Sequence, residues 1–140
     1  MALKASTRIT VRNAEAELPG GFGAGCVELL EGVDEEHSLN RAAKRMGMAY
    51  SKAWRIVNEA EDQLGCKLLD RNGALGSTLT EDGHRAVDGY RKLQAEVDAL
   101  VARRLPELLK RTAQERLLRA VRDSRGEGRA SSPNPTPKTP

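Results

Sequence analysis

One short stretch of the 140-residue chain holds the side chains best suited to contact double-stranded DNA. These residues are Tyr50, Ser51, Lys52, Trp54 and Arg55. An arginine guanidinium can donate to the paired acceptors of guanine, and a serine hydroxyl can donate or accept at a base edge. A lysine can bind a phosphate, and the aromatic rings can touch thymine methyl groups or sugars. The stretch predicts a DNA contact if one helix carries these side chains outward.

The same residues also have plainer interpretations. Trp54 could be a core or rim residue that packs against the hairpin following it in sequence. Lys52 and Arg55 could simply lie on a solvated helix face. The elements that carry the three residues decide between these possibilities.

Further basic residues lie nearby in the sequence. Arg71 is expected at the base of a hairpin, where it would meet a phosphate or the minor groove. It could equally pair with Asp70 or Glu81. The candidate phosphate contacts on the helix before Tyr50 are Arg41, Lys44 and Arg45.

Two adjacent helices would position these side chains. Ser38 can cap the first with its hydroxyl, apolar residues then recur at helical spacing, and Gly47 can end the helix. A longer helix is expected from near Tyr50 to Leu64, with one apolar stripe and Gly65 at its end. The polar side chains at its start face away from that stripe.

The spacing within this pair predicts a helix-turn-helix, in which the helices press closely together across a tight turn. Ala43 offers a small side chain for the close contact, and Gly47 offers a positive φ. Ala53 and Ile56 anchor the second helix, and Met48 can enter the core. Chance matches occur in alanine-rich chains, so the elements around the pair also matter.

Before the pair, residues 7–12 alternate polar and apolar, as in a half-buried strand with Ile9 and Val11 on one face. The glycine-rich residues 18–25 predict a turn that ends this strand. Apolar residues then fall on one side of a helix from Cys26 to about Glu35.

After the pair, two short extended pieces, residues 67–71 and 77–79, flank an Asn-Gly turn, and together they predict a β-hairpin. Thr80 can cap a helix that reaches at least Arg104. Three helices, a hairpin and a long helix indicate a mainly α fold, a winged helix-turn-helix with an N-terminal strand, a short β-hairpin wing and a long C-terminal dimerisation helix.

One apolar stripe follows the long helix. Its members are Val87, Tyr90, Leu93, Val97 and Leu100. A stripe of this length exceeds the core that so small a domain could place beneath it. We therefore expect a second copy of the same helix to cover it, giving a homodimer.

Charge and composition divide the chain. We expect a DNA-binding domain with its dimerisation helix over residues 1–103, a basic helical extension over 104–123 and a disordered tail over 124–140. Residues 1–102 carry 13 basic and 16 acidic side chains, whereas residues 103–140 carry 10 and 4. The net charge of +3 is thus no evidence for DNA binding by the folded part, and the position of each cation must carry that argument.

Other classes of function lack a sequence signal. No apolar run is long enough to cross a bilayer and no signal peptide is visible, so we expect a cytoplasmic protein without membrane contact. Cys26 and Cys66 have no metal-ligand spacing with His37 and His84, so reduced structural thiols, no metal and no cofactor are expected. No nucleophile lies near either histidine in sequence, and we expect no enzyme activity.

Several motifs between residues 23 and 58 have a familiar order. They are Gly23-Ala24-Gly25, Val27-Glu28-Leu29-Leu30, Ser38, Ala42-Ala43, Met46-Gly47-Met48, Tyr50-Ser51-Lys52-Ala53-Trp54 and Asn58. Together they resemble the N-terminal DNA-binding domain of the ModE family of molybdate-responsive transcriptional regulators, over roughly residues 6–103. The segment from Leu39 to Gly83 also resembles the winged-helix domain of LysR-type regulators.

The resemblance implies a dimer that binds a near-palindromic operator, with Tyr50 to Trp54 at the start of the recognition helix. Two positions depart from the family pattern. Ala49 stands where a capping serine is usual, and residues 72–76 replace a longer glycine run in the wing. Molybdate-sensing members carry C-terminal β-barrels, and the roughly 37 residues after the long helix are too few and too polar for one. We therefore do not expect molybdate binding in this chain.

The sequence thus predicts a homodimeric, DNA-binding transcriptional regulator. The alternative is a winged-helix protein-interaction adaptor that does not bind DNA, which the net negative charge of residues 1–102 favours.

Overall fold

The computed structural model describes residues 2–124, with the side chains of residues 110–114 excepted. The chain divides into two compact units. One is Thr7–Asp98, and the other consists of Met1–Ser6 with Ala99–Pro140. The predicted functional residues lie in Thr7–Asp98, apart from Leu100 of the apolar stripe.

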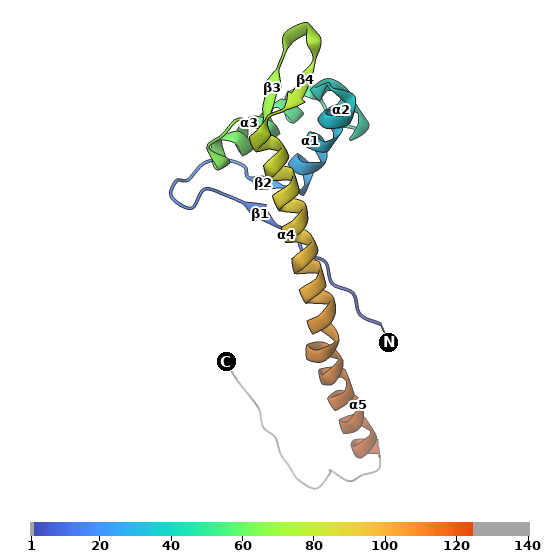
Figure 1. Ribbon diagram of the computed structural model, residues 1–140. Coiled ribbons are helices and arrows are strands. Elements are labelled where there is room, and N and C mark those ends of the chain that lie inside the picture. The colour runs from blue at the N-terminus through green and yellow to red at the C-terminus, as the bar shows by residue number, and fades with distance from the viewer. Residues whose placement is uncertain (1, 125–140) are drawn as a thin grey trace. The chain divides into compact units, whose positions relative to one another are not determined.

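Three helices form the centre of this unit: α1 (Ala24–Glu36), α2 (Leu39–Arg45) and α3 (Tyr50–Leu64) (Figure 1). The Ser38 hydroxyl accepts a hydrogen bond of 3.1 Å from a backbone N–H in the first turn of α2, which satisfies one of the free donors at that end. Gly65 ends α3 with a φ of 72°. The predicted helix pair and its caps are confirmed.

Two strands of two residues each precede α1. Strand β1 (Thr10–Val11) pairs antiparallel with β2 (Phe22–Gly23), with Val11 opposite Phe22. The predicted strand over residues 7–12 is therefore shorter than expected. The glycine-rich stretch, expected only to turn, contains β2, and α1 begins at Ala24 rather than at Cys26.

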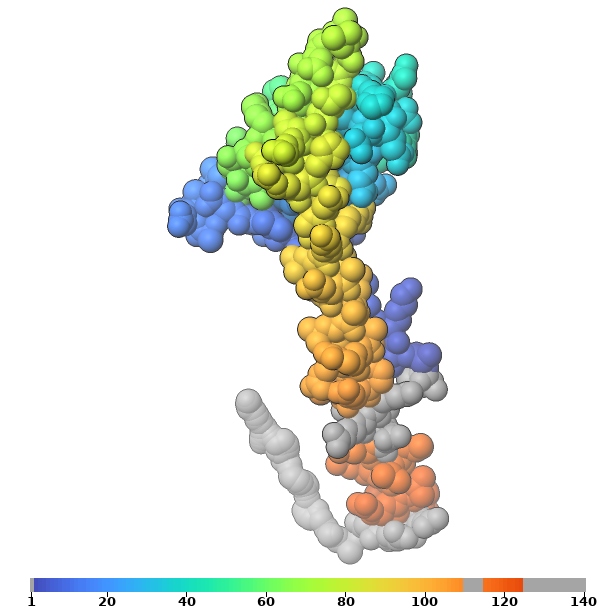
Figure 2. Space-filling view, viewed as in Figure 1, coloured from blue at the N-terminus to red at the C-terminus, as the bar shows by residue number. Residues whose placement is uncertain are grey.

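The predicted hairpin is present and forms the wing. Strands β3 (Leu69–Arg71) and β4 (Ser77–Leu79) pair antiparallel, joined through a short 3₁₀ turn at Gly73–Leu75. The Ser77 backbone N–H donates to the His37 carbonyl at 2.9 Å, which attaches β4 to the end of α1. Figure 2 shows the light-green tip of the wing standing out beyond the helices.

Helix α4 (Glu81–Leu105) follows the wing and begins with the predicted cap, because the Thr80 hydroxyl accepts a backbone N–H of its first turn at 2.9 Å. A π-helical turn, Pro106–Lys110, and helix α5 (Arg111–Ser124) belong to the second unit. The tail predicted over residues 124–140 lies outside the described residues beyond Ser124. Among residues 2–124, no helix combines the length and the apolar character needed to cross a bilayer.

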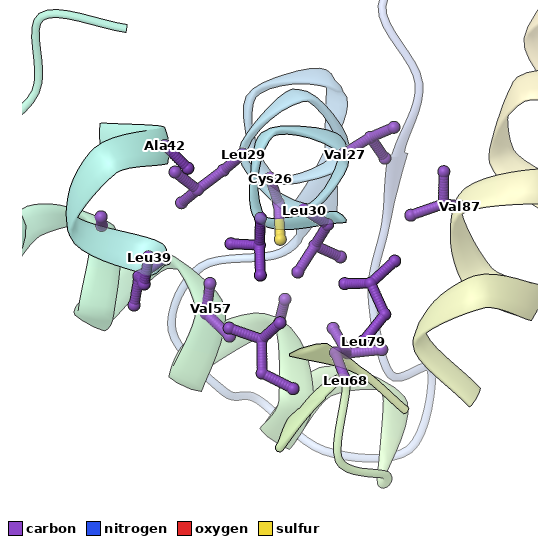
Figure 3. Packing of buried hydrophobic residues seen from close by; sticks show 14 of the residues in the cluster. Cys26, Val27, Leu29, Leu30, Leu39, Ala42, Val57, Leu68, Leu79 and Val87 are labelled. Carbon is purple, nitrogen blue, oxygen red and sulfur yellow. The ribbon is translucent and has the colours of Figure 1, made fainter. Parts of the chain in front are cut away.

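Side chains from every helix of Thr7–Asp98 and from the wing converge on one core (Figure 3). Leu29, Leu30 and Leu68 have no exposed surface, and each such side chain contributes about 1.5–3 kcal/mol on burial. Helices α1 and α2 approach closely because Gly32 has no side chain: a Cβ there would lie 2.9 Å from that of Ala42.

Two residues predicted on the dimer surface belong to this core instead. Val87 is 7% exposed and Tyr90 is 4% exposed. The Tyr90 ring meets Phe22 edge-on at 5.7 Å between centroids, and its hydroxyl donates to the Ile9 carbonyl at 2.9 Å. Phe22 of β2 and the residue just before β1 thus contact Tyr90 of α4. The less buried members of the predicted stripe are Leu93, Val97 and Leu100.

Candidate nucleic-acid interface

The turn between α2 and α3 has the tight geometry that the sequence predicts. Gly47 has a φ of 67°, and the Met48 N–H donates to the Ala43 carbonyl at 2.9 Å. Ala43 and Ala53 are fully buried, so small side chains form the contact between the helices. As a result of this packing, the predicted contact residues at the start of α3 point away from the core.

All five residues predicted for DNA contact on α3 are exposed. Tyr50 is 48% exposed and Trp54 is 46% exposed, and Ser51, Lys52 and Arg55 are also open to solvent. Arg55 forms an exposed ion pair with Glu59, one turn further along, at 3.5 Å. Such a pair contributes about 0.3–0.5 kcal/mol and can give way to a stronger partner.

The basic residues of α2 differ in their availability. Arg41 and Lys44 are exposed. Arg45 instead binds two carboxylates at the end of α1, with its Nη1 at 2.8 Å from Glu35 and 3.4 Å from Glu36. Among the contacts of residues 2–124, Arg41 and Lys44 form no ion pair, so they are the stronger candidates for phosphate contacts.

Charge is unevenly distributed around the helix pair. Residues 39–58, which span α2, the turn and the first half of α3, hold five basic residues and no acidic residue. Residues 1–102 as a whole carry three more acidic than basic side chains. A segment-by-segment count could have revealed this signal in the sequence, whereas the totals conceal it. The acidic side chains of the fold therefore lie outside residues 39–58, and those of α3 all fall in its second half.

Glu61 illustrates how one acidic residue beside this segment is used internally. Its side chain is 7% exposed and accepts the backbone N–H groups of Leu68 and Leu69 at 2.8 and 3.3 Å. The Lys67 ammonium lies 3.7 Å from the same carboxylate. Glu61 thus joins α3 to the start of the wing, and its carboxylate does not lie on the exposed surface of α3.

Arg71 connects the wing to α3 by two contacts. Its Nη2 donates to the Asn58 side-chain oxygen at 3.2 Å, and its guanidinium carbon lies 5.5 Å from the centre of the Trp54 ring. Among the contacts of residues 2–124, no ion pair joins Arg71 to Asp70 or Glu81. Trp54 is therefore a rim residue beside the hairpin, and its ring remains about half exposed.

The wing and the starts of both helices share one face. They surround a shallow hollow of about 250 Å³. Its lining residues are Ser38, Leu39, Asn40, Tyr50, Arg71, Gly73, Gly76 and Ser77. The structure thus brings Tyr50 and Arg71 together, which their sequence separation alone could not establish.

The cysteines contribute no reactive centre to this face. Both thiols are free, and burial together with the charge of Glu61 raises the pKa of Cys26 to about 12. Within the part of the chain that the structure describes, no three His, Cys, Asp or Glu side chains gather as metal ligands would.

The part of the chain that contains the helix pair and the wing is similar to known proteins. Residues 27–84 match the family of bacterial regulatory helix-turn-helix proteins described as the lysR family. The molybdenum transport protein ModE of Azotobacter vinelandii is 33% identical over 81 residues, covering 55% of this chain and 30% of that protein. The predicted resemblance to both families is confirmed, and the match to the lysR family covers residues 27–84, from α1 through the wing to the start of α4. The chain spans less than a third of the length of the ModE protein.

Solved structures of LysR-type proteins are also similar. The BenM DNA-binding domain, in complex with catB site 1 DNA, is 28% identical, with a TM-score of 0.46 over 64% of this chain and 92% of that one. The LysR family transcriptional regulator VV2_1132 is 24% identical, with a TM-score of 0.48 over 59% of this chain and 28% of that one.

Proposed function

We propose that this chain is a DNA-binding transcriptional regulator, not an enzyme, and that it acts as a homodimer on a near-palindromic operator. The observation that carries the proposal is the exposed surface of a LysR-type helix-turn-helix whose residues 39–58 hold five cations and no carboxylate. Duplex DNA is a dense line of negative charge, so such a surface attracts it.

Each exposed residue has a role in this proposal. The start of α3 enters the major groove, where Arg55 reads guanine and Ser51 contacts a base edge. Tyr50 and Trp54 touch thymine methyl groups or sugars. The phosphate contacts are Arg41, Lys44 and Lys52, and Arg71 meets the backbone or the minor groove at the wing.

The dimer forms through α4. Leu93 and Leu100 are 45% and 49% exposed, and Val97 lies between them at helical spacing. A second copy of the same residues is the covering surface that a two-fold axis supplies.

A matched pair of variants tests whether Arg55 recognises a base. Arg55→Ala removes an exposed arginine that pairs with a glutamate four residues away at 3.5 Å, and Arg85→Ala on α4 removes an exposed arginine that pairs with Glu81 at the same distance and also with Asp82 at 3.3 Å. We expect Arg55→Ala to reduce discrimination between a selected operator and its single-base variants by about 1–3 kcal/mol at the contacted position, and Arg85→Ala to leave it unchanged. Equal behaviour of the two variants would contradict the proposal.

The second candidate is an adaptor that uses the winged-helix scaffold to bind protein. The excess of acidic residues in residues 1–102 favours it. An adaptor would bind no duplex even at low salt, so direct titration with DNA separates the two functions.

A further inference from the structure

Arg71 of the wing contacts both Trp54 and Asn58 of α3. These contacts join two elements that the proposed function places on different parts of a duplex. Trp54 and Asn58 lie one turn apart on α3, and Arg71 ends β3. The guanidinium of Arg71 both donates to Asn58 at 3.2 Å and lies over the Trp54 ring at 5.5 Å. One side chain of the wing is thus held from two directions by the recognition helix.

The wing carries so little positive charge that the position of the Arg71 side chain determines how the wing can attract DNA. Between residues 68 and 84, Arg71 is the only basic residue, and the loop from Asn72 to Gly76 is uncharged. Any attraction of the wing for a phosphate or for the minor groove therefore depends on Arg71. An arginine that is free to rotate loses conformational entropy when it is fixed against DNA. One that is already held loses less.

Asn58 is suited to hold it. Its side chain is partly buried on α3, and its amide oxygen can only accept, which matches the donors of a guanidinium. The flat face of Trp54 fixes the plane of the same group. Both neighbours leave further N–H donors of Arg71 unused in the described contacts, since a guanidinium carries five.

Building on the proposed function, we propose that Asn58 is a positioning residue for DNA binding. It holds Arg71 over Trp54, so that the wing cation and the recognition helix meet the duplex as one pre-arranged unit. Asn58 acts through Arg71 and not by contacting the duplex itself.

The first test needs no DNA. Trp54 is the only tryptophan of the chain, so acrylamide quenching of its fluorescence reports whether Arg71 covers the ring. We expect Asn58→Ala to raise quenching as Arg71→Ala does, and the double variant to raise it no further. Asn58→Asp keeps an acceptor for Arg71 and should retain the wild-type quenching. Asn72→Ala, which removes a wing side chain bonded to Thr78, is the matched control and should also leave it unchanged.

The second test measures affinity for a duplex that the wild-type protein selects from random-sequence DNA. We expect Asn58→Ala to weaken binding about 3- to 10-fold, the range for losing one hydrogen bond. In the Arg71→Ala background the same change should cost less than about two-fold, because coupled residues are not additive. Arg71→Ala should also make the salt slope shallower by about 2, because the proposed dimer loses one phosphate contact in each copy. Thermal melting of each variant shows that it is folded.

Two results would overturn the proposal. One is unchanged Trp54 quenching in Asn58→Ala, because Arg71 would then keep its place without Asn58. The other is a double variant whose loss of affinity equals the product of the two single losses. If the wild-type protein bound no duplex, the proposed function would fail with the affinity arm of this inference, while the quenching data would still show whether Asn58 positions Arg71.

Discussion

At the scale of single residues, the two free cysteines differ in access. Cys26 is 3% exposed in the core, whereas Cys66 is partly exposed after α3. Burial first, and nearby carboxylates second, raise the pKa of both thiols, that of Cys26 to about 12. Because the thiolate is the reactive form, a covered thiol of high pKa is inert.

We predict that an aromatic disulfide reagent modifies one thiol of the native protein near pH 8 and reaches the second only after denaturation. Cys66→Ser should abolish the native reaction, and Cys26→Ser should preserve it. Equal rates for both thiols in the folded protein would contradict the burial of Cys26.

The Glu31 and Arg91 pair makes stability depend on pH. Arg91 donates from Nε and Nη2 to the Glu31 carboxylate at 2.9 and 2.5 Å, and these hydrogen bonds lower the pKa of Glu31. A pKa lowered by folding stabilises the fold above the unfolded-state pKa, and the contribution is lost as the pH falls through the folded-state value.

We therefore predict that Glu31→Gln lowers the free energy of unfolding by about 0.5–1 kcal/mol at pH 7, a value reduced by the exposure of the pair. The difference from wild type should shrink as the pH falls below the pKa of a free glutamate. Denaturant titrations at several pH values measure it, with Glu96→Gln on α4 as the control. A difference that grows on acidification would contradict the assignment.

At the scale of elements, close packing of α1 on α2 depends on a glycine. A Cβ on Gly32 would lie 2.9 Å from that of Ala42, whereas one on Gly89, in the exposed middle of α4, would meet nothing within 4 Å. We predict that Gly32→Ala destabilises the fold by about 1–3 kcal/mol, because the helices must separate. Gly89→Ala should stabilise it by about 0.5–1 kcal/mol. Thermal or denaturant unfolding compares them, and equal shifts would contradict the packing.

Elements with a strong local signal could be predicted from the sequence. Helices α2, α3 and α4 and the wing follow from apolar spacing, capping residues and an Asn-Gly turn. Strand β2 could not be predicted, because two residues give no alternation and the glycines around Phe22 favour a turn. Periodicity also cannot tell which surface covers a stripe, so it predicts a dimer contact for Val87 and Tyr90, although the core of the chain itself buries both.

Only part of the candidate site could likewise be predicted from the sequence. The exposure of Lys52 and Arg55 follows from their position opposite the apolar stripe of α3. The partners of Arg71 do not, because Asn58 and Trp54 lie 13 and 17 positions earlier and only the folded chain brings them near. The sequence therefore indicates which residues are available, and tertiary contacts establish which are held.

At the scale of the whole molecule, the proposed dimer rests on the exposed stripe of α4. We predict that Val97→Glu converts the protein to a monomer, because a charge cannot be buried between two copies without a partner. Ala95→Glu lies on the opposite side of the same helix and should leave the dimer intact. Sedimentation equilibrium measures both, and a wild-type monomer, or a Val97→Glu dimer, would contradict this mode of assembly.

The central claim is that the acid-free cationic segment of residues 39–58 binds duplex DNA, and the salt dependence of affinity tests it most directly. Each neutralised phosphate releases counterions, so log affinity falls against log salt with a slope of about −0.9 per contact. Backbone contacts from Arg41, Lys44, Lys52 and Arg71 in two copies predict a slope of about −7 for a selected operator. A slope near zero, or no measurable affinity at low salt, would contradict the account.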